Sequence, residues 1–165
     1  TRLWQRGLEQ VEMIVSDGAE AVASAAAMVY PRAAHQLCLV HWFKNLEAVT
    51  PPLPAEQRRK LRRDFWWIWQ AESEGEARSW ALRFRRRWQF WAPEMVQKFQ
   101  AEFSRVLAYL RFPARWRHRL RTTNLDEGFF CHLRKYLSRF PGCVDPAHSE
   151  HILGCFLLAA ERMHA

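Results

Sequence analysis

The first fifty residues alternate short apolar runs with segments of helical pattern. Residues 11–15 form an apolar run that predicts a buried strand, and the Ala-rich stretch 19–29 predicts a helix. A second apolar run at 35–40 predicts a second strand, and 42–49 predicts a second helix that ends before a cluster of prolines. Strand, helix, strand and helix in this order predict a βαβ unit with parallel strands.

The middle of the chain has helical spacing of apolar residues throughout. Between residues 55 and 110, aromatic and aliphatic side chains recur every three or four positions, so three helices are expected. We interpret these aromatic residues as the core ridges of a helical subdomain and not as platforms for stacking bases. The three expected stripes are Leu61, Phe65, Ile68 and Trp69; Trp80, Ala81, Phe84, Trp88 and Trp91; and Met95, Phe99, Phe103, Val106 and Leu110.

The C-terminal third begins with a basic stretch at 111–121. A last helix is expected from about 146 to about 163. Before it, a helix is expected over 123–140, with an apolar stripe formed by Leu125, Phe129, Leu133, Leu137 and Phe140. We therefore expect three segments: an α/β segment at 1–51, an all-helical insertion at 52–112, and helices that return to the α/β core at 113–165. Because two parallel strands need neighbours to pair their backbone groups, an unprotected sheet edge is also expected.

Composition narrows the class of protein. A chain of 165 residues with 49% hydrophobic residues, nine Trp and eleven Phe is long enough for one domain with a large core. The net charge of +8 favours a polyanionic partner, because guanidinium groups pair with phosphates and release counterions. No segment has the apolar length of a membrane span or a secretory signal, and the four cysteines are scattered. We therefore expect an intracellular, cytoplasmic protein with a polyanionic partner, for which an anionic membrane surface is still an option.

Asp17 follows the first predicted strand directly. The carboxyl ends of strands in open α/β sheets are where ligands bind, so Asp17 is a candidate metal ligand. The alternative is that Asp17 caps the Ala-rich helix, with Glu20 completing a capping box. Local pattern alone leaves both interpretations open.

Glu127 falls in the first turn of the helix expected over 123–140. It lies off the apolar stripe and shares a face with Cys131 and Arg134, which suits a metal or phosphate site. The alternative is again a local one, in which Asn124 caps the helix and Glu127 reaches back to it.

Cys38 and His41 form a C-x2-H pair, a spacing that one metal ion accepts. No matching pair stands nearby to complete four ligands, and Cys143, His148 and His151 occupy unrelated positions, so zinc is not expected. We interpret Cys38 and His41 as packed groups that orient the loop carrying Asp17.

These motifs together resemble the Mutator family of DDE transposases. The resemblance spans nearly the whole chain, with several motifs in the same order and spacing. It rests on Val15-Ser16-Asp17-Gly18, Tyr30-Pro31, His35 through His41, Lys44-Asn45-Leu46, Thr122-Thr123-Asn124 with Glu127, and Leu133-Arg134-Lys135.

The resemblance implies a fold and a reaction. The fold would be an α/β, ribonuclease-H-like sheet, incomplete here, interrupted by the helical insertion and predominantly helical overall. Asp17 would be the second catalytic acid and Glu127 the third, while the family's first Asp would lie on an earlier strand that these residues lack. Three such acids hold two Mg²⁺ ions, for which Mn²⁺ substitutes, and cleave and join DNA strands. The 165 residues as given are accordingly expected to be inactive.

The same resemblance assigns roles to basic residues. The protein would work at DNA and not at a membrane, with transposon ends and target DNA as its partners, and a homodimer is left open. Arg121, Arg134 and Lys135 would contact phosphates near the cut, and an arginine cluster would follow the DNA backbone, unless it is simply a solvated helix face. That cluster is Arg83, Arg85, Arg86 and Arg87. Two rival interpretations are an inactive transposase relic or fragment that binds DNA or protein, and a helical nucleic-acid-binding module with a zinc clip at Cys38 and His41.

Overall fold

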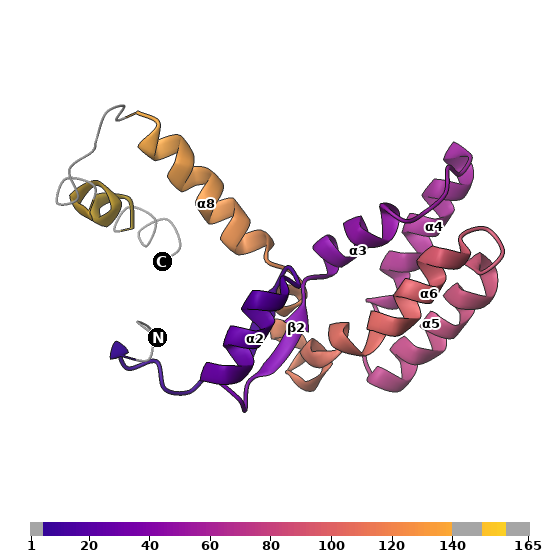
Figure 1. Ribbon diagram of the computed structural model, residues 1–165, viewed down its shortest axis with the longest axis horizontal. Helices are drawn as coiled ribbons and strands as arrows, with labels where there is room; N and C mark the ends of the chain where they lie inside the picture. Colours follow the sequence, from indigo (N-terminus) through magenta and orange to yellow (C-terminus); the bar gives the residue numbers. More distant parts are fainter. Residues whose placement is uncertain (1–4, 140–149, 158–165) are drawn as a thin grey trace. The chain divides into compact units, whose positions relative to one another are not determined.

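The computed structural model describes residues 5–139 and 150–157, which form two compact units (Figure 1). The first unit ends at Thr123 and the second begins at Asn124. None of the described helices is long and apolar enough to cross a membrane.

The first unit contains the expected βαβ motif. Strand β1 (Met13–Ser16) pairs in parallel with β2 (Ala34–Leu37), with Met13 opposite Ala34, and helix α2 (Glu20–Val29) connects them. The α/β class is therefore confirmed as a small two-stranded sheet in a mostly helical chain.

The second strand is shorter than its apolar run predicted. It ends at Leu37, and helix α3 (Leu39–Glu47) begins two residues later, so the assignment of Leu39 and Val40 to a strand is wrong. Leu39 lies three and four residues before the buried side chains of Trp42 and Phe43, so the run is helical in period from Leu39 onward.

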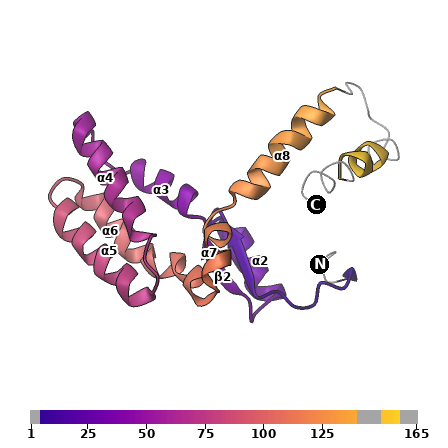
Figure 2. The ribbon, with the colours of Figure 1, turned by 180° about the vertical axis from the view of Figure 1, so that it is seen from behind.

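Helices α4 (Ala55–Ile68), α5 (Glu74–Trp88) and α6 (Pro93–Glu102) form the helical part, seen from both sides in Figures 1 and 2. The third stripe does not stay in one helix as predicted. After Glu102 it continues as two short 3-10 helices, η1 (Phe103–Val106) and η2 (Ala108–Arg111).

Phe65 lies at the centre of the aromatic core of this part. It is fully buried, and its ring centroid lies 4.4 Å from that of Phe43, 5.5 Å from Trp42 and 5.6 Å from Trp69. Two buried indole groups are paired: the Trp42 Nε1 donates to Glu102 at 2.6 Å and the Trp88 Nε1 to Asp64 at 3.2 Å. The buried Trp69 Nε1 has no hydrogen-bond partner within the described residues. The core interpretation of the aromatic stripes is thereby confirmed for most members.

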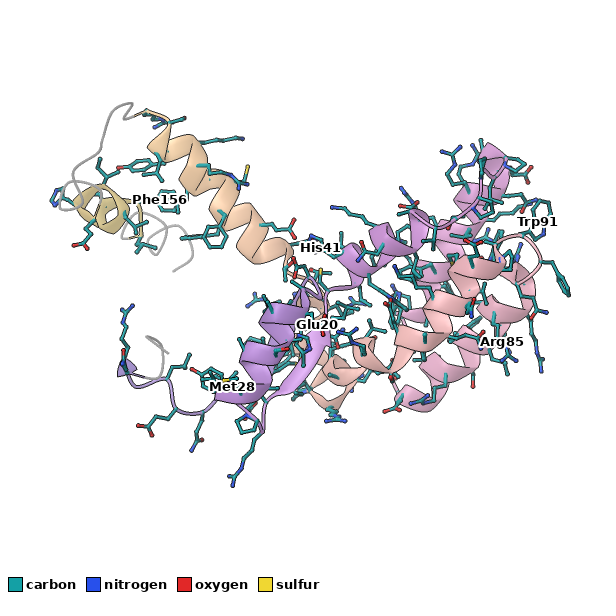
Figure 3. All side chains as sticks on the ribbon, in the orientation of Figure 1. Glu20, Met28, His41, Arg85, Trp91 and Phe156 are labelled. Atoms are coloured by element: carbon teal, nitrogen blue, oxygen red, sulfur yellow. The ribbon has the colours of Figure 1, made fainter. Side chains whose placement is uncertain are left out.

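Trp91 is the main exception. Its side chain is 48% exposed, and it follows the end of α5 at the turn into α6, where Figure 3 labels it. The neighbouring Phe90 is 86% exposed. The prediction of Trp91 as a core residue is wrong because the helix ends before the stripe completes its next turn.

Gln36 joins the sheet to the helical part. Its amide is fully buried in β2, where Nε2 donates to the carbonyls of Leu37 at 2.8 Å and Val106 at 3.1 Å, and Oε1 accepts from the Tyr109 N–H at 3.1 Å. These bonds satisfy backbone groups at the point where η1 passes into η2, which explains why the third helix is interrupted there.

The second unit starts with α8 (Asn124–Leu137), and residues 150–157 are also helical. The ring of Phe156 packs against Phe129 and Tyr136 of α8, with centroids 5.4 and 5.3 Å apart. The stripe predicted for this helix is confirmed at Phe129, while Leu137 is 40% exposed. Cys143, His148 and the expected beginning of the last helix lie outside the described residues.

Candidate active site

Asp17 stands at the carboxyl end of β1, as the pattern predicted. Its Oδ1 accepts the Ala19 N–H at 3.1 Å, and within the described residues the other carboxylate oxygen has no hydrogen-bond partner. The capping alternative is wrong in its predicted form, because Ala19 and not Asp17 is the N-cap of α2 and no side-chain cap bond forms there. The carboxylate is exposed and open to a ligand.

Gly18 makes the turn that presents this carboxylate. Its φ of +93° belongs to the left-handed region, and a Cβ at this position would collide with the Leu37 side chain. The loop after β1 therefore requires glycine for both backbone conformation and space.

Ser16 and His35 flank the loop from inside. The Ser16 Oγ and the His35 Nε2 share a hydrogen bond of 2.8 Å, and the Gly18 N–H donates to Ser16 Oγ at 3.3 Å. Burial, and then the positive charge of Arg105, lower the pKa of His35 below its ordinary value. Sequence reasoning missed this pair, although residues on adjacent parallel strands with a two-residue offset share a face.

Cys38 connects three segments that carry motif residues. Its backbone N–H donates to the Ser16 carbonyl at 2.7 Å, and its fully buried Sγ accepts from both the N–H and the Oγ1–H of Thr123, each at 3.4 Å. The next residue, Leu39, donates its N–H to the Arg121 carbonyl at 2.9 Å. We call this set of contacts the Cys38 seam. It fixes residues 121–123, directly before α8, beside the carboxyl ends of both strands.

His41 completes the surroundings of the thiol. Its Nδ1 lies 3.3 Å from the Cys38 Sγ. Burial raises the pKa of Cys38, but hydrogen bonds from Thr123 and His41 outweigh burial and place the pKa below its ordinary value. Figure 3 labels His41 and Glu20, on the helices that follow the two strand ends. No group of three or more His, Cys, Asp or Glu side chains gathers around a metal position among residues 5–139 and 150–157.

Glu127 lies in the first turn of α8 and is exposed. It belongs to the second unit and follows Thr123, the last residue of the Cys38 seam, by four positions. Arg134 and Lys135 are exposed on the same helix. Arg134 is seven residues beyond Glu127, roughly 10 Å along the helix axis.

Arg121 and Arg117 make contacts within the chain. The Arg121 Nη1 donates to the Trp69 carbonyl at 2.7 Å, and its guanidinium lies 5.9 Å from the Tyr109 ring centroid. Arg117 donates hydrogen bonds to the backbone carbonyls of Glu72, Leu110 and Phe112. The contact with Trp69 gives Arg121 a structural role that the sequence pattern did not show, and its predicted contact with phosphate stays a prediction.

The arginine cluster on α5 does not form a single face. Arg83 and Arg87 both border a hollow lined by Asp64 and Trp67 of α4, so they face that helix. Arg87 pairs with Asp64 at 3.0 Å, and the Arg83 guanidinium lies 4.6 Å from the ring centroid of Trp80 on α5 itself. Arg85 instead borders a hollow next to Phe99 of α6, while Arg86 is exposed. Successive residues of a helix point about 100° apart, so adjacent arginines cannot all meet one ligand.

The chain is similar to transposases of bacterial insertion sequences. It is 33% identical over 144 residues to the transposase for insertion sequence element IST2 of Acidithiobacillus ferrooxidans. The aligned region covers 86% of this chain and 47% of that protein. It is 30% identical over 124 residues to the transposase for insertion sequence element IS1201 of Lactobacillus helveticus, covering 75% of this chain and 33% of that protein.

A family match agrees with these similarities. Residues 1–142 match the family described as "Transposase, Mutator family". The chain therefore belongs to the Mutator family of transposases, as its motifs predicted. It spans between about a third and about half of the length of the curated relatives it matches.

Proposed function

We propose that this chain is the part of a Mutator transposase that supplies Asp17 and Glu127 to a metal site for DNA strand cleavage and strand transfer. In this proposal the small sheet belongs to a ribonuclease-H-like fold, and residues 52–112 are its helical insertion. The partners are DNA ends and target DNA. The Cys38 seam is the observation that carries the proposal.

The seam ties the loop of Asp17 to residues 121–123 within the first unit. Through its N–H, Cys38 holds the carbonyl of Ser16, the residue before Asp17. Through its Sγ, it holds Thr123, which precedes the helix of Glu127. Glu127 itself is assigned as the partner acid because it follows Thr122-Thr123-Asn124 at the interval of the family motif.

The donor set suits a hard divalent cation. Mg²⁺ takes oxygen ligands, keeps several waters, and uses one or two carboxylates at enzyme sites. The exposed carboxylate of Asp17, with one oxygen unengaged, fits that requirement. When bound, paired Mg²⁺ or Mn²⁺ ions activate the attacking oxygen and stabilise the leaving oxygen at phosphorus.

The protein groups then divide the work by their position. Asp17 and Glu127 act as metal ligands and not as general bases. Arg134 and Lys135, exposed on α8, neutralise phosphate charge, and the exposed Arg86 of α5 contacts the DNA backbone at a distance from the cut. The resemblance calls for a third acid, so we expect no nicking of duplex DNA by these 165 residues alone in Mg²⁺ or Mn²⁺.

Metal binding by the chain itself tests the assignment without relying on activity. Titration with Mn²⁺ followed by electron paramagnetic resonance should show one bound ion whose affinity falls at least tenfold in Asp17→Asn and in Glu127→Gln. Glu20→Gln removes a neighbouring carboxylate in the first turn of α2 and should leave the affinity unchanged. Equal affinity in all four proteins would overturn the metal site.

A further inference from the structure

Helix α7 (Ala114–Leu120) sorts its arginines into two groups. Arg117 is directed inward: Nε donates to the Phe112 carbonyl at 2.8 Å, Nη1 to the Glu72 carbonyl at 2.7 Å and Nη2 to the Leu110 carbonyl at 3.1 Å. Arg115 and Arg119 are exposed instead. The first group holds the helix in place, and the second is free to meet a partner.

Trp116 organises the exposed pair. Its indole ring is 46% exposed, although a large aromatic side chain is usually buried, and Trp116 is not among the described residues that pack against the hydrophobic core. The guanidinium carbons of Arg115 and Arg119 both lie 5.9 Å from the centroid of this ring. Cation–π attraction of this kind limits the conformations of two otherwise flexible side chains.

The surroundings of this face are strongly cationic in sequence. Between Phe103 and Leu125 there is no Asp or Glu, while arginines recur at 105, 111, 115, 117, 119 and 121. Within the described residues, the hydrogen bond from α7 to Glu72 uses the backbone carbonyl of that residue and not its carboxylate. An anion that approaches Arg115 and Arg119 meets no competing carboxylate along this segment.

The helix also adjoins the candidate active site. Leu120 ends α7, and the next residue, Arg121, accepts the Leu39 N–H within the Cys38 seam. Figure 2 shows α7 beside β2, seen from behind. DNA held on α7 therefore lies next to the strand end that carries Asp17.

We propose that the exposed face formed by Arg115, Trp116 and Arg119 binds the phosphate backbone of duplex DNA beside the candidate active site. The inference rests on the proposed function, because that function supplies DNA as the partner. Each guanidinium is planar and can donate two parallel hydrogen bonds to one phosphate. Contact with the Trp116 ring restricts both side chains before DNA binds. Contacts of this kind give affinity and register and not sequence choice.

Fluorescence anisotropy with a labelled duplex of arbitrary sequence, measured at several salt concentrations, tests the proposal. In Arg115→Gln/Arg119→Gln, the slope of log affinity against log salt should decrease in magnitude by about 2, since each phosphate contact contributes about 0.9. Affinity in dilute buffer should fall at least tenfold. The matched control, Arg58→Gln/Arg59→Gln, removes the same charge from exposed positions on α4 and should change both quantities much less.

Two variants separate the role of the ring from that of the charges. Trp116→Ala should weaken binding several-fold while the salt slope stays unchanged, because both charges remain, and Trp116→Phe should restore most of the affinity. Thermal midpoints close to that of the unaltered chain will show that these exposed substitutions leave the fold intact.

The outcomes distinguish this inference from the function on which it rests. Salt-dependent binding in which both double variants lose the same affinity for duplex DNA overturns the role of α7. That result does not bear on the metal site, which the Mn²⁺ titration tests separately. Failure of the unaltered chain to bind duplex in dilute buffer overturns both the α7 surface and the proposed contacts with DNA.

Discussion

The α/β segment and the helical part of the first unit are stabilised in different ways. None of the ten residues of α2 is buried, whereas α4 alone buries Leu61, Phe65 and Ile68. The helical part is held by a continuous aromatic core. The segment that carries Asp17 is held by a few specific hydrogen bonds around Gln36 and Cys38. Within the first unit, most of the buried core and the candidate metal ligand Asp17 thus lie in separate regions.

The largest expected effect is in the aromatic core. Phe65→Ala should lower the free energy of unfolding by about 3–5 kcal/mol, because it leaves a cavity among closely packed rings. Val22→Ala, at a residue 44% exposed on α2, should change it by less than about 0.5 kcal/mol. Urea denaturation gives both values. Phe90→Ala is the control for loss of an aromatic ring from an exposed position. A loss of unfolding free energy in Val22→Ala equal to that in Phe65→Ala would contradict the division into two regions.

A smaller effect is expected where the two regions meet. Gln36→Leu keeps side-chain volume but leaves the Val106 carbonyl and the Tyr109 N–H buried without partners, at a cost of about 2–4 kcal/mol. Gln97→Leu, at an exposed position on α6, should be nearly neutral. Chemical denaturation compares the two variants. Equal stability would show that the amide of Gln36 does not join the regions.

The smallest expected effect is a dependence on pH. Because the pKa of His35 is lowered in the folded chain, the neutral imidazole is favoured there, and its contribution to stability is complete above the ordinary imidazole pKa. That contribution decreases as pH falls from the ordinary pKa toward the lower folded value. Thermal midpoints measured across this range should decrease on acidification by less in His35→Gln than in the unaltered chain. An equal decrease in both proteins would assign the effect to other groups.

Much of the fold follows from local pattern. Short apolar runs placed both strands, an Ala-rich stretch placed the crossover helix, and spacing of three and four residues placed the three helical stripes, because burial against a core imposes that period on a helix. The apolar run through Leu39 and Val40 was wrongly predicted to be part of the second strand, because a short apolar run fits a strand and a buried helix end equally well. The buried Gln36 within β2 was missed because its partners, Val106 and Tyr109, are about seventy residues away.

The candidate site was predictable only in part. Local sequence placed Asp17 at a strand end and Glu127 in a first helical turn, and the structure agrees with both positions. Local sequence did not reveal the hydrogen bonds between Cys38 and Thr123, because they join residues 85 positions apart. Charge alone also could not distinguish Arg117 from Arg115 and Arg119 on the same helix, although the Arg117 guanidinium donates hydrogen bonds to three backbone carbonyls.

The central claim is that Asp17 and Glu127 share one metal site. Nuclear magnetic resonance of the ¹⁵N-labelled chain during addition of Mn²⁺ tests it most directly, with the amide signals of Gly18 and Gly128 as neighbours of the two acids. We predict that both signals broaden together at the same Mn²⁺ concentration, and that Asp17→Asn removes the broadening at Gly128 as well as at Gly18. Broadening confined to one glycine, or broadening at Gly128 that persists in Asp17→Asn, would contradict the shared site.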